Sequence, residues 1–359
     1  MFWNFVPKHR FFLLKVRNIR NYVPYLLENN YILEIYLTIL NKGVIYVKRL
    51  LSCNASDFME MDPQELKQAI LASEGRTVCS EMVIVHEPVI HDVTNAEVAR
   101  AAGADLILLN LLDCLEPLIM GMDGVSFQNY ASIKEAKTFN KNLIRDLKKL
   151  VCRPIGVNLE PVAEEGTSML EGRLEIPEGR KCTEATLKAA NELGFDFICL
   201  TGNPGTGVSN QTIGESIKLA KKYFSGLIIA GKMHSSGVNE PVVTKEAIEE
   251  FVENGVDILL VPAVGTVPGL GETDLREIVS FAKEKEILTM SAIGTSQESS
   301  RVETIRQIAI ENKKIGVDIQ HIGDSGYNGM ANVENLFEMA IAIRGMRHTL
   351  SMIARSINR

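Results

Sequence analysis

The sequence predicts a (β/α)8 barrel, because a short motif recurs at barrel spacing. Gly-x-Asp followed by an apolar run begins at Gly103, Gly194, Gly255 and Gly316. The last three copies stand 61 residues apart (194, 255, 316), and the first gap is 91 (103 to 194). Gly after a helix fits a left-handed cap, and a short apolar run fits a strand buried on both faces. One more strand-like run lies between each pair of copies and another precedes the first, so a strand and a helix recur eight times, about every 30 residues.

The individual elements follow in the order that such a barrel requires. Asp62, Pro63 and Glu65 are typical of a helix start, and the helix to Ser73 is expected to close the bottom of the barrel. The predicted strands are 78–85, 106–110, 155–159, 195–201, 227–230, 258–262, 288–292 and 319–322. The predicted helices include 95–102, 137–150, one that begins at Thr183, and 333–344. An acid-rich loop over 160–181 follows the third strand and has the length of a lid or substrate clamp.

Composition and charge narrow the class of protein. The chain has 359 residues, a net charge of −7 and 46% hydrophobic residues, which suits one large domain. The acidic balance gives no basic footprint for nucleic acid. Six scattered cysteines without a Cys-x-x-Cys pair indicate a reduced, cytoplasmic protein, and no apolar run is long enough to span a membrane. Self-association, common among barrels, is left open.

Residues 1–46 do not follow the barrel pattern, so the barrel domain is expected over 47–359. The first segment holds Trp3, the only tryptophan, and is basic although the rest of the chain is acidic. A translation start at Val47, encoded by GTG, would explain this segment as a mis-assigned or disordered extension. A basic amphipathic membrane anchor is the alternative.

Small residues and hydroxyls follow the last two strands. Gly294, Thr295 and Ser296 come after the seventh strand, and Gly323, Ser325 and Gly326 come after the eighth. In this fold a phosphate group commonly lies between these two loops. We therefore expect these six residues to bind the phosphate of a small-molecule substrate. The alternative is that the glycines only form the tight turns between strand and helix that any barrel needs. The carboxylate of Asp324 would repel a phosphate group unless a metal ion or a lysine offsets its charge.

Two basic side chains and one acid are the catalytic candidates. Lys232 and His234 follow the fifth strand, and Glu160 follows the third. A lysine at the barrel mouth can form a Schiff base, act as a base or hold a phosphate, with His234 and Glu160 assisting proton transfer. The alternative for Lys232 is an ion pair with a glutamate of a neighbouring strand.

Further polar residues end the early strands. Asn110, Asn158 and Asn203 are expected to orient the substrate, and Glu81 with Glu160 is the candidate pair for one Mg²⁺. His321 lies inside the eighth strand beside Gln320, and alternation puts one of the two in the lumen. The four Asp of the repeated motif lie at the strand-entering end and are expected to be structural.

Several long segments together resemble a known family. LGFDFICLTGNPGTGVSN (193–210), GLIIAGKMHSSGV (226–238), AIGTSQESS (292–300) and HIGDSGYNGMANVENL (321–336) are similar to an uncharacterised bacterial family of TIM-barrel proteins, often labelled "haloacid dehalogenase-like hydrolase". The resemblance covers about 47–359 and implies a fold close to the phosphate-binding barrels. Haloacid dehalogenase-type chemistry uses Asp-x-Asp, and the chain contains no such pair.

The predicted function is therefore a metabolic enzyme acting on a small phosphorylated substrate. A lyase of the aldolase type or an isomerase or epimerase fits the candidate residues. The alternatives are a metal-assisted hydrolase or lyase that uses Glu81 and Glu160, and a sugar-phosphate sensor without catalysis.

Overall fold

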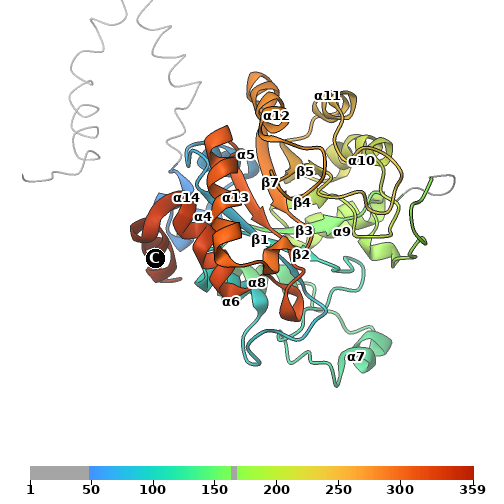
Figure 1. Ribbon diagram of the computed structural model, residues 1–359. Coiled ribbons are helices and arrows are strands. Elements are labelled where there is room, and N and C mark those ends of the chain that lie inside the picture. Colours follow the sequence, from blue (N-terminus) through green and yellow to red (C-terminus); the bar gives the residue numbers. More distant parts are fainter. Residues whose placement is uncertain (1–47, 163–167) are drawn as a thin grey trace, which may run out of the picture. The chain divides into compact units, whose positions relative to one another are not determined.

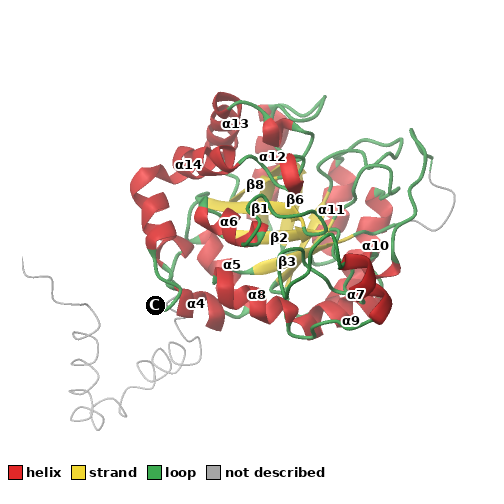
Figure 2. Ribbon diagram, turned by 90° about the horizontal axis from the view of Figure 1, so that it is seen from below, coloured by secondary structure: helices red, strands yellow, loops and turns green. Residues whose placement is uncertain are grey.

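The chain folds into a closed barrel of eight parallel strands, which confirms the predicted (β/α)8 fold. The computed structural model describes residues 48–162 and 168–359, so the interpretation of residues 1–46 lies outside the described residues. Each strand pairs with the next in sequence, and β8 closes the barrel on β1. Helices surround the strands (Figures 1 and 2).

The strands agree with the predicted ones to within two residues at each end. They are β1 (Thr77–Val83), β2 (Leu106–Asn110), β3 (Ile155–Leu159), β4 (Phe197–Leu200), β5 (Leu227–Gly231), β6 (Ile258–Pro262), β7 (Leu288–Ile293) and β8 (Ile319–Ile322). The α-helices are α4 (Ala55–Glu60), α5 (Pro63–Leu71), α6 (Asn95–Ala101), α7 (Tyr130–Ala136), α8 (Leu143–Val151), α9 (Glu184–Leu193), α10 (Asn210–Tyr223), α11 (Lys245–Glu253), α12 (Glu272–Glu284), α13 (Val302–Ile315) and α14 (Val333–Ala354). Short 3₁₀ turns lie at η1 (Leu50–Ser52), η2 (Glu178–Arg180), η3 (Gln297–Ser299) and η4 (Tyr327–Gly329).

Two helices depart from the predicted bounds. The expected helix over 137–150 begins later, at Leu143, because Lys137 ends α7 in a left-handed conformation. The last helical segment runs to Ala354 and not to Arg344, with a break at Gly345, whose φ is 78°. Glycine adopts this conformation without steric cost, so the chain continues past the break.

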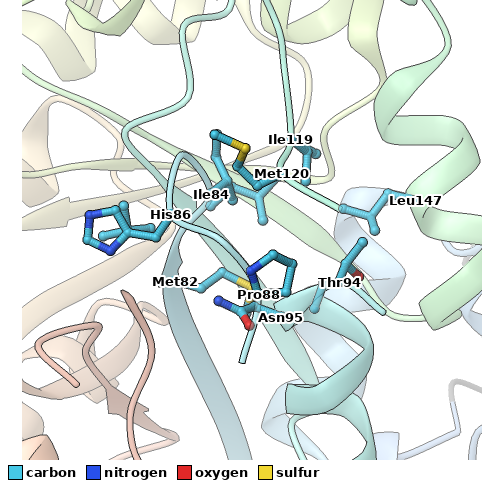
Figure 3. A pocket seen from close by; sticks show the side chains of 12 residues that line it. Met82, Ile84, His86, Pro88, Thr94, Asn95, Ile119, Met120 and Leu147 are labelled. Atoms are coloured by element: carbon cyan, nitrogen blue, oxygen red, sulfur yellow. The ribbon is translucent and has the colours of Figure 1, made fainter. Parts of the chain in front are cut away.

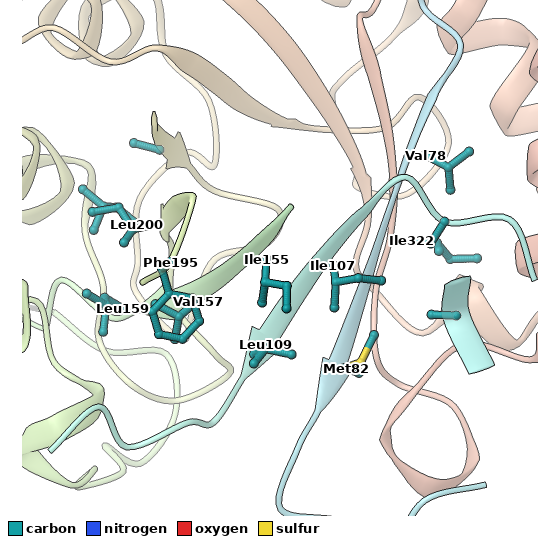
Figure 4. Packing of buried hydrophobic residues seen from close by; sticks show 14 of the residues in the cluster. Val78, Met82, Ile107, Leu109, Ile155, Val157, Leu159, Phe195, Leu200 and Ile322 are labelled. Carbon is teal, nitrogen blue, oxygen red and sulfur yellow. The ribbon is translucent and has the colours of Figure 1, made fainter. Parts of the chain in front are cut away.

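Alternate residues of every strand pack outward against the helices. Val78, Met82, Ile107, Leu109, Ile155, Val157, Leu159, Leu200 and Ile322 belong to one buried cluster that also contains helix residues (Figure 4). The residues between them face the lumen, because strand side chains alternate. Glu81, Asn158 and His321 therefore point into the barrel, which decides the orientation of His321.

The four Asp of the repeated motif tie the strand-entering end together. The carboxylates of Asp105, Asp196, Asp257 and Asp318 accept the backbone N–H of Val78, Ile155, Ile228 and Thr289, at 2.8–3.0 Å. Each Asp backbone N–H in turn donates to the carbonyl of that same residue. Every even strand is thus held to the start of the preceding odd strand.

Cations of the helix layer lie beside three of the four carboxylates at this end. Arg344 lies 2.6 Å from Asp105, Lys148 lies 2.5 Å from Asp196, and Lys67 of α5 lies 4.0 Å from Asp257. The Lys67 contact places α5 at the strand-entering end, where the sequence predicts a closing helix. The four Asp are structural, as expected from their place before the strands.

All six cysteines are free thiols. Within residues 48–162 and 168–359, no helix combines the length and the apolar character that crossing a bilayer requires.

Candidate functional site

The carboxyl end of the barrel holds a histidine and a glutamate in contact. His321 Nε2 lies 3.1 Å from Glu81 Oε2, and both residues are buried, 0% and 3% exposed. Burial raises the pKa of Glu81 to about 8, and the neighbouring carboxylates Glu298 and Glu160 add to the rise. Burial lowers the pKa of His321 to about 4. At neutral pH the Glu81 carboxyl group is therefore protonated and the His321 imidazole is neutral, so the pair carries no net charge.

The His321 imidazole is not bonded to the protein. In the part of the chain that the structure describes, neither its Nδ1 nor its Nε2 has a hydrogen-bond partner. The 3.1 Å contact with Glu81 is close but not aligned. Apo active sites often hold their groups loosely in this way, and a small rotation would align them. Nδ1 is thus left for a ligand, and Nε2 faces Glu81.

Two more carboxyl groups surround this pair. Asp324, in the loop after β8, is partly exposed, and burial followed by the charge of Glu81 raises its pKa to about 7. Glu298, in η3, is 1% exposed, and burial raises its pKa as well. Its Oε1 accepts the backbone N–H of Ser325 at 3.1 Å. Its Oε2 has no hydrogen-bond partner among the described residues.

The three predicted asparagines meet in one network. Asn110 Nδ2 donates to Asn203 Oδ1 and to Asp324 Oδ2, both at 2.8 Å. Asn158 Nδ2 and Asn203 Nδ2 both donate to Asn110 Oδ1, at 3.1 Å. Asn158 Oδ1 is buried and unpartnered among the described residues. Asn110, at the end of β2, therefore links Asp324 to the other two asparagines.

Glu160 is held by an arginine. Arg180 lies 2.5 Å from Glu160 Oε1, and the backbone N–H of Asn203 donates to Oε2 at 2.9 Å. The backbone N–H of Glu160 also donates to the Arg180 carbonyl, at 2.8 Å. Both carboxylate oxygens are thus occupied, so Glu160 fixes the loops after β3 and β4 and is not free to act as a base.

Lys232 forms an ion pair, as its alternative interpretation expected, but with a glutamate of its own loop and not with one of a neighbouring strand. Its ammonium is buried and lies 2.9 Å from Glu240 Oε1, and burial lowers its pKa. The same oxygen accepts the first backbone N–H of α10, that of Asn210, at 2.7 Å. The pair therefore joins the loop after β5 to the start of α10.

His234 lies beside Lys232 and is neutral. Burial and then the charge of Lys232 lower the pKa of His234 to about 4. Its Nδ1 accepts the backbone N–H of Ser236 at 3.0 Å. This bond fixes the ring within its own loop and apart from the Glu81–His321 pair.

The predicted phosphate loops are only partly available to a ligand. The backbone N–H groups of Gly323, Ser325 and Gly326 donate to Ile293, Glu298 and Asp324 respectively. Thr295 Oγ1 donates to the Thr266 carbonyl at 2.8 Å, and Ser296 has a φ of 71°.

The predicted magnesium pair stays a prediction. Among the described residues, no group of three or more His, Cys, Asp and Glu side chains is arranged to hold a metal ion. The prediction, however, used two carboxylates with substrate oxygens. Glu81 contacts His321 and Glu160 contacts Arg180, so each acid already has another partner.

Two hollows lie outside the lumen. A cavity of about 10 Å³ lies between β1 and α6, beside Met82, Pro88 and Met120, and is too small for a substrate (Figure 3). A groove of about 1360 Å³ lies between the loop after β3 and the start of α10, with Glu160, Ser209 and Glu240 in its wall. The groove is wide enough for a small metabolite.

The family match covers most of the chain. The family described as "Domain of unknown function (DUF7916)" matches residues 51–359. The chain belongs to the DUF7916 family. No curated protein matches the sequence of this DUF7916 chain.

Solved structures with a similar fold share little sequence with the DUF7916 chain. Thiamine phosphate pyrophosphorylase from Pyrococcus furiosus is 14% identical, with a TM-score of 0.41 over 76% of this chain and 100% of that chain. A 2,3-dimethylmalate lyase of the PEP mutase/isocitrate lyase superfamily is 13% identical, with a TM-score of 0.41 over 72% and 80%. A phosphonopyruvate hydrolase in complex with oxalate and Mg²⁺ is 15% identical, with a TM-score of 0.40 over 73% and 80%.

Two site residues of the DUF7916 chain were missed from the sequence. Glu298 lies in a loop singled out only for its small residues, and Arg180 lies in a loop singled out for its acids. The position of Glu298 just after β7 could have indicated the barrel mouth. Nothing in the sequence pairs Arg180 with Glu160.

Proposed function

We propose that this protein is a proton-transfer enzyme, an isomerase, epimerase or lyase that acts on a small phosphorylated substrate at the carboxyl end of the barrel. The observation that carries the proposal is the buried contact between Glu81 and His321. A neutral imidazole and a protonated carboxyl group at one place form a base and an acid that both work at neutral pH.

The reaction follows from the protonation states of the three groups. His321, neutral because its pKa is lowered to about 4, accepts a proton from a substrate carbon next to a carbonyl group. Glu81, protonated because its pKa is raised to about 8, donates a proton to the developing oxyanion or to the opposite face of the carbon. The proton taken up by His321 then returns to Glu81 across their 3.1 Å contact, which resets both groups. Asp324, with a pKa of about 7, can exchange protons beside them.

The neighbouring residues orient the substrate. The amides of Asn110, Asn158 and Asn203 fix Asp324 and present an unpartnered carbonyl oxygen at Asn158. In the proposal the phosphate binds to the loop Gly294 to Ser296, because the backbone N–H groups of the loop after β8 already donate to protein oxygens. In this proposal Lys232 and Glu160 hold loops in place and do not touch the reacting carbon.

Exchange of a carbon-bound proton with solvent tests the proposal. The full chain is incubated in D₂O with aldose, ketose and 2-hydroxy-acid phosphates and with the unphosphorylated compounds, and ¹H NMR follows each C–H signal. We expect deuterium to replace a proton next to a carbonyl group in a phosphorylated compound. His321→Gln should slow this exchange at least about 100-fold, and His348→Gln, in α14, should not.

Other outcomes favour the alternatives. Binding of a phosphorylated compound without exchange would favour the sensor. Turnover that chelation abolishes and Mg²⁺ restores would favour metal assistance. Exchange that survives His321→Gln unchanged would overturn the proposal.

A further inference from the structure

The inner end of the site is lined with carboxyl groups. Glu298 and Glu160 act on Glu81 and raise its pKa, and Glu81 and Asp324 act in the same sense on Asp324 and Glu298 respectively. His321 acts on Asp324 and Glu298 in the opposite sense, but its own pKa of about 4 leaves it neutral at pH 7. Arg180 is bonded to Glu160. At neutral pH these charges therefore include no positive partner for Glu298 and Asp324.

Unpartnered acceptor atoms occur in the same place. Glu298 is 1% exposed and His321 is 0% exposed. Glu298 Oε2 and both His321 ring nitrogens have no hydrogen-bond partner in residues 48–162 and 168–359. Buried polar atoms are normally bonded in native proteins, and an exception at an active site is typically the place of a ligand. Ionised Glu298 Oε2 and one of the two nitrogens of the neutral His321 ring accept hydrogen bonds, so the missing group supplies donors.

Backbone packing fixes Glu298 where it is. Asn335 Nδ2 donates to the Glu298 carbonyl at 2.8 Å, and the Ser325 N–H holds Oε1. A Cβ at position 323 would lie 2.9 Å from Oε1, so Gly323 leaves room for the carboxyl group. The unpartnered oxygen is thus part of a built site and not a mobile surface acid.

We infer that the inner end of the site binds a primary ammonium group of the substrate, held by Glu298 and Asp324. The inference rests on the proposed function for the place of the reaction, and it names the substrate class as an amino compound, such as an amino sugar. A charge-assisted hydrogen bond from ammonium to carboxylate is about twice as strong as a neutral one. The ammonium supplies both the donors and the positive charge that this end lacks.

Proton release accompanies such binding. An ammonium group next to Glu298 and Asp324 favours their ionised forms and lowers their pKa values, so binding at pH 7 expels protons. A second anionic group at the same place would raise those pKa values and take protons up. The groups that act on them are Glu81 and His321, and Asn110 is bonded to Asp324 as the Ser325 N–H is to Glu298.

A set of four matched ligands separates ammonium from phosphate. Glucosamine, glucose and their 6-phosphates are titrated into the full chain by calorimetry at pH 7, in two buffers of different ionisation enthalpy. Serinol and glycerol repeat the comparison on a three-carbon scaffold. We expect the amino member of at least one pair to bind at least tenfold more tightly than its hydroxyl counterpart, with net proton release.

Variants locate the effect. Glu298→Gln keeps an oxygen for the Ser325 N–H and should remove the preference for the amino member. Asp324→Asn is the second variant, in case Glu298→Gln lowers the stability of the fold. Glu272→Gln, at the exposed start of α12, is the control and should retain the preference.

Specific results would overturn the inference. Equal affinity for the two members of every pair, no binding by any of them, proton uptake on binding the amine, or an equal effect from Mg²⁺ alone would each do so. The calorimetry measures binding only, so loss of the ammonium preference is distinguishable from failure of solvent exchange. A phosphate preference without an ammonium preference would leave the proposed function standing alone.

Discussion

His321 and Glu81 meet across the seam at which the barrel closes. Backbone pairing sets His321 opposite Cys79, and the side chain reaches Glu81, two residues further along β1, at 3.1 Å. The two residues come from the last and the first strand, 240 positions apart (321 minus 81). The candidate acid–base pair therefore exists only after the whole barrel has closed.

The raised pKa of Glu81 makes stability depend on pH. Its pKa rises from the ordinary value of 4.5 to about 8 in the fold, so between these values the folded state binds more protons than the unfolded state. The free energy of unfolding should therefore fall as pH rises from about 5 to 8, by on the order of 3 kcal/mol for this group. Glu81→Gln should flatten the fall, measured by urea unfolding at several pH values. A slope unchanged by Glu81→Gln, and equal to that of the control Glu272→Gln, would contradict the assignment.

The ion pair between Lys232 and Glu240 should contribute to the stability of the fold. The Lys232 ammonium is buried against Glu240, whose side chain is 25% exposed, so breaking the pair leaves one partly solvated charge. Lys232→Met should cost about 1–3 kcal/mol, and Lys232→Met with Glu240→Gln should cost less than the sum of the two. A double-mutant cycle by urea unfolding measures this. Full stability of Lys232→Met together with complete loss of proton exchange would instead return Lys232 to the reacting centre.

The four repeated Asp should differ in their contribution. Asp105 and Arg344 are both 0% exposed in their side chains and lie 2.6 Å apart. The cations near Asp257 are 3.8–4.0 Å away, and one of them, Lys221, is 47% exposed. Asp105→Ala should lower the free energy of unfolding by about 3–5 kcal/mol, because it leaves the buried Arg344 without its carboxylate partner. Asp257→Ala should lower it by about 1–2 kcal/mol. Thermal and urea unfolding of both variants measure the two stability losses. Equal losses would refute the predicted difference.

The two glycines of the predicted phosphate loops should respond differently to alanine. A Cβ at Gly323 would lie 2.8 Å from the Ile293 carbonyl and 2.9 Å from Glu298 Oε1. A Cβ at Gly294 would meet Met233, mainly its flexible side chain. Gly323→Ala should therefore lower the melting temperature and displace Glu298, whereas Gly294→Ala should be milder because methionine repacks easily. Melting curves of the two variants decide, and a milder Gly323→Ala would be inconsistent with a fixed Glu298.

Periodicity predicted the barrel because each Gly-x-Asp repeat marks a helix end and a strand start by local physics. Gly194 and Gly316 do end their helices in the left-handed conformation, at φ 91° and 106°. The site was predicted in part: Asn110, Asn158 and Asn203 converge because the carboxyl ends of parallel strands share one end of the barrel. The partner of Lys232 could not be chosen, since Glu240 lies in the following loop and its direction depends on the start of α10. Arg180 was missed for the same reason, as its pairing with Glu160 depends on how a long loop folds back.

The charge state of His321 tests the central claim most directly. ¹⁵N NMR of the histidine side chains, with His321 assigned by its absence in His321→Gln, follows the ring from pH 8 to pH 4. The account predicts that His321 stays neutral down to about pH 4, with Glu81 as the protonated partner at neutral pH. An imidazolium at pH 7, or a titration near the ordinary value of 6.5, would show an ionised pair and contradict the neutral acid–base pair on which the proposed function depends.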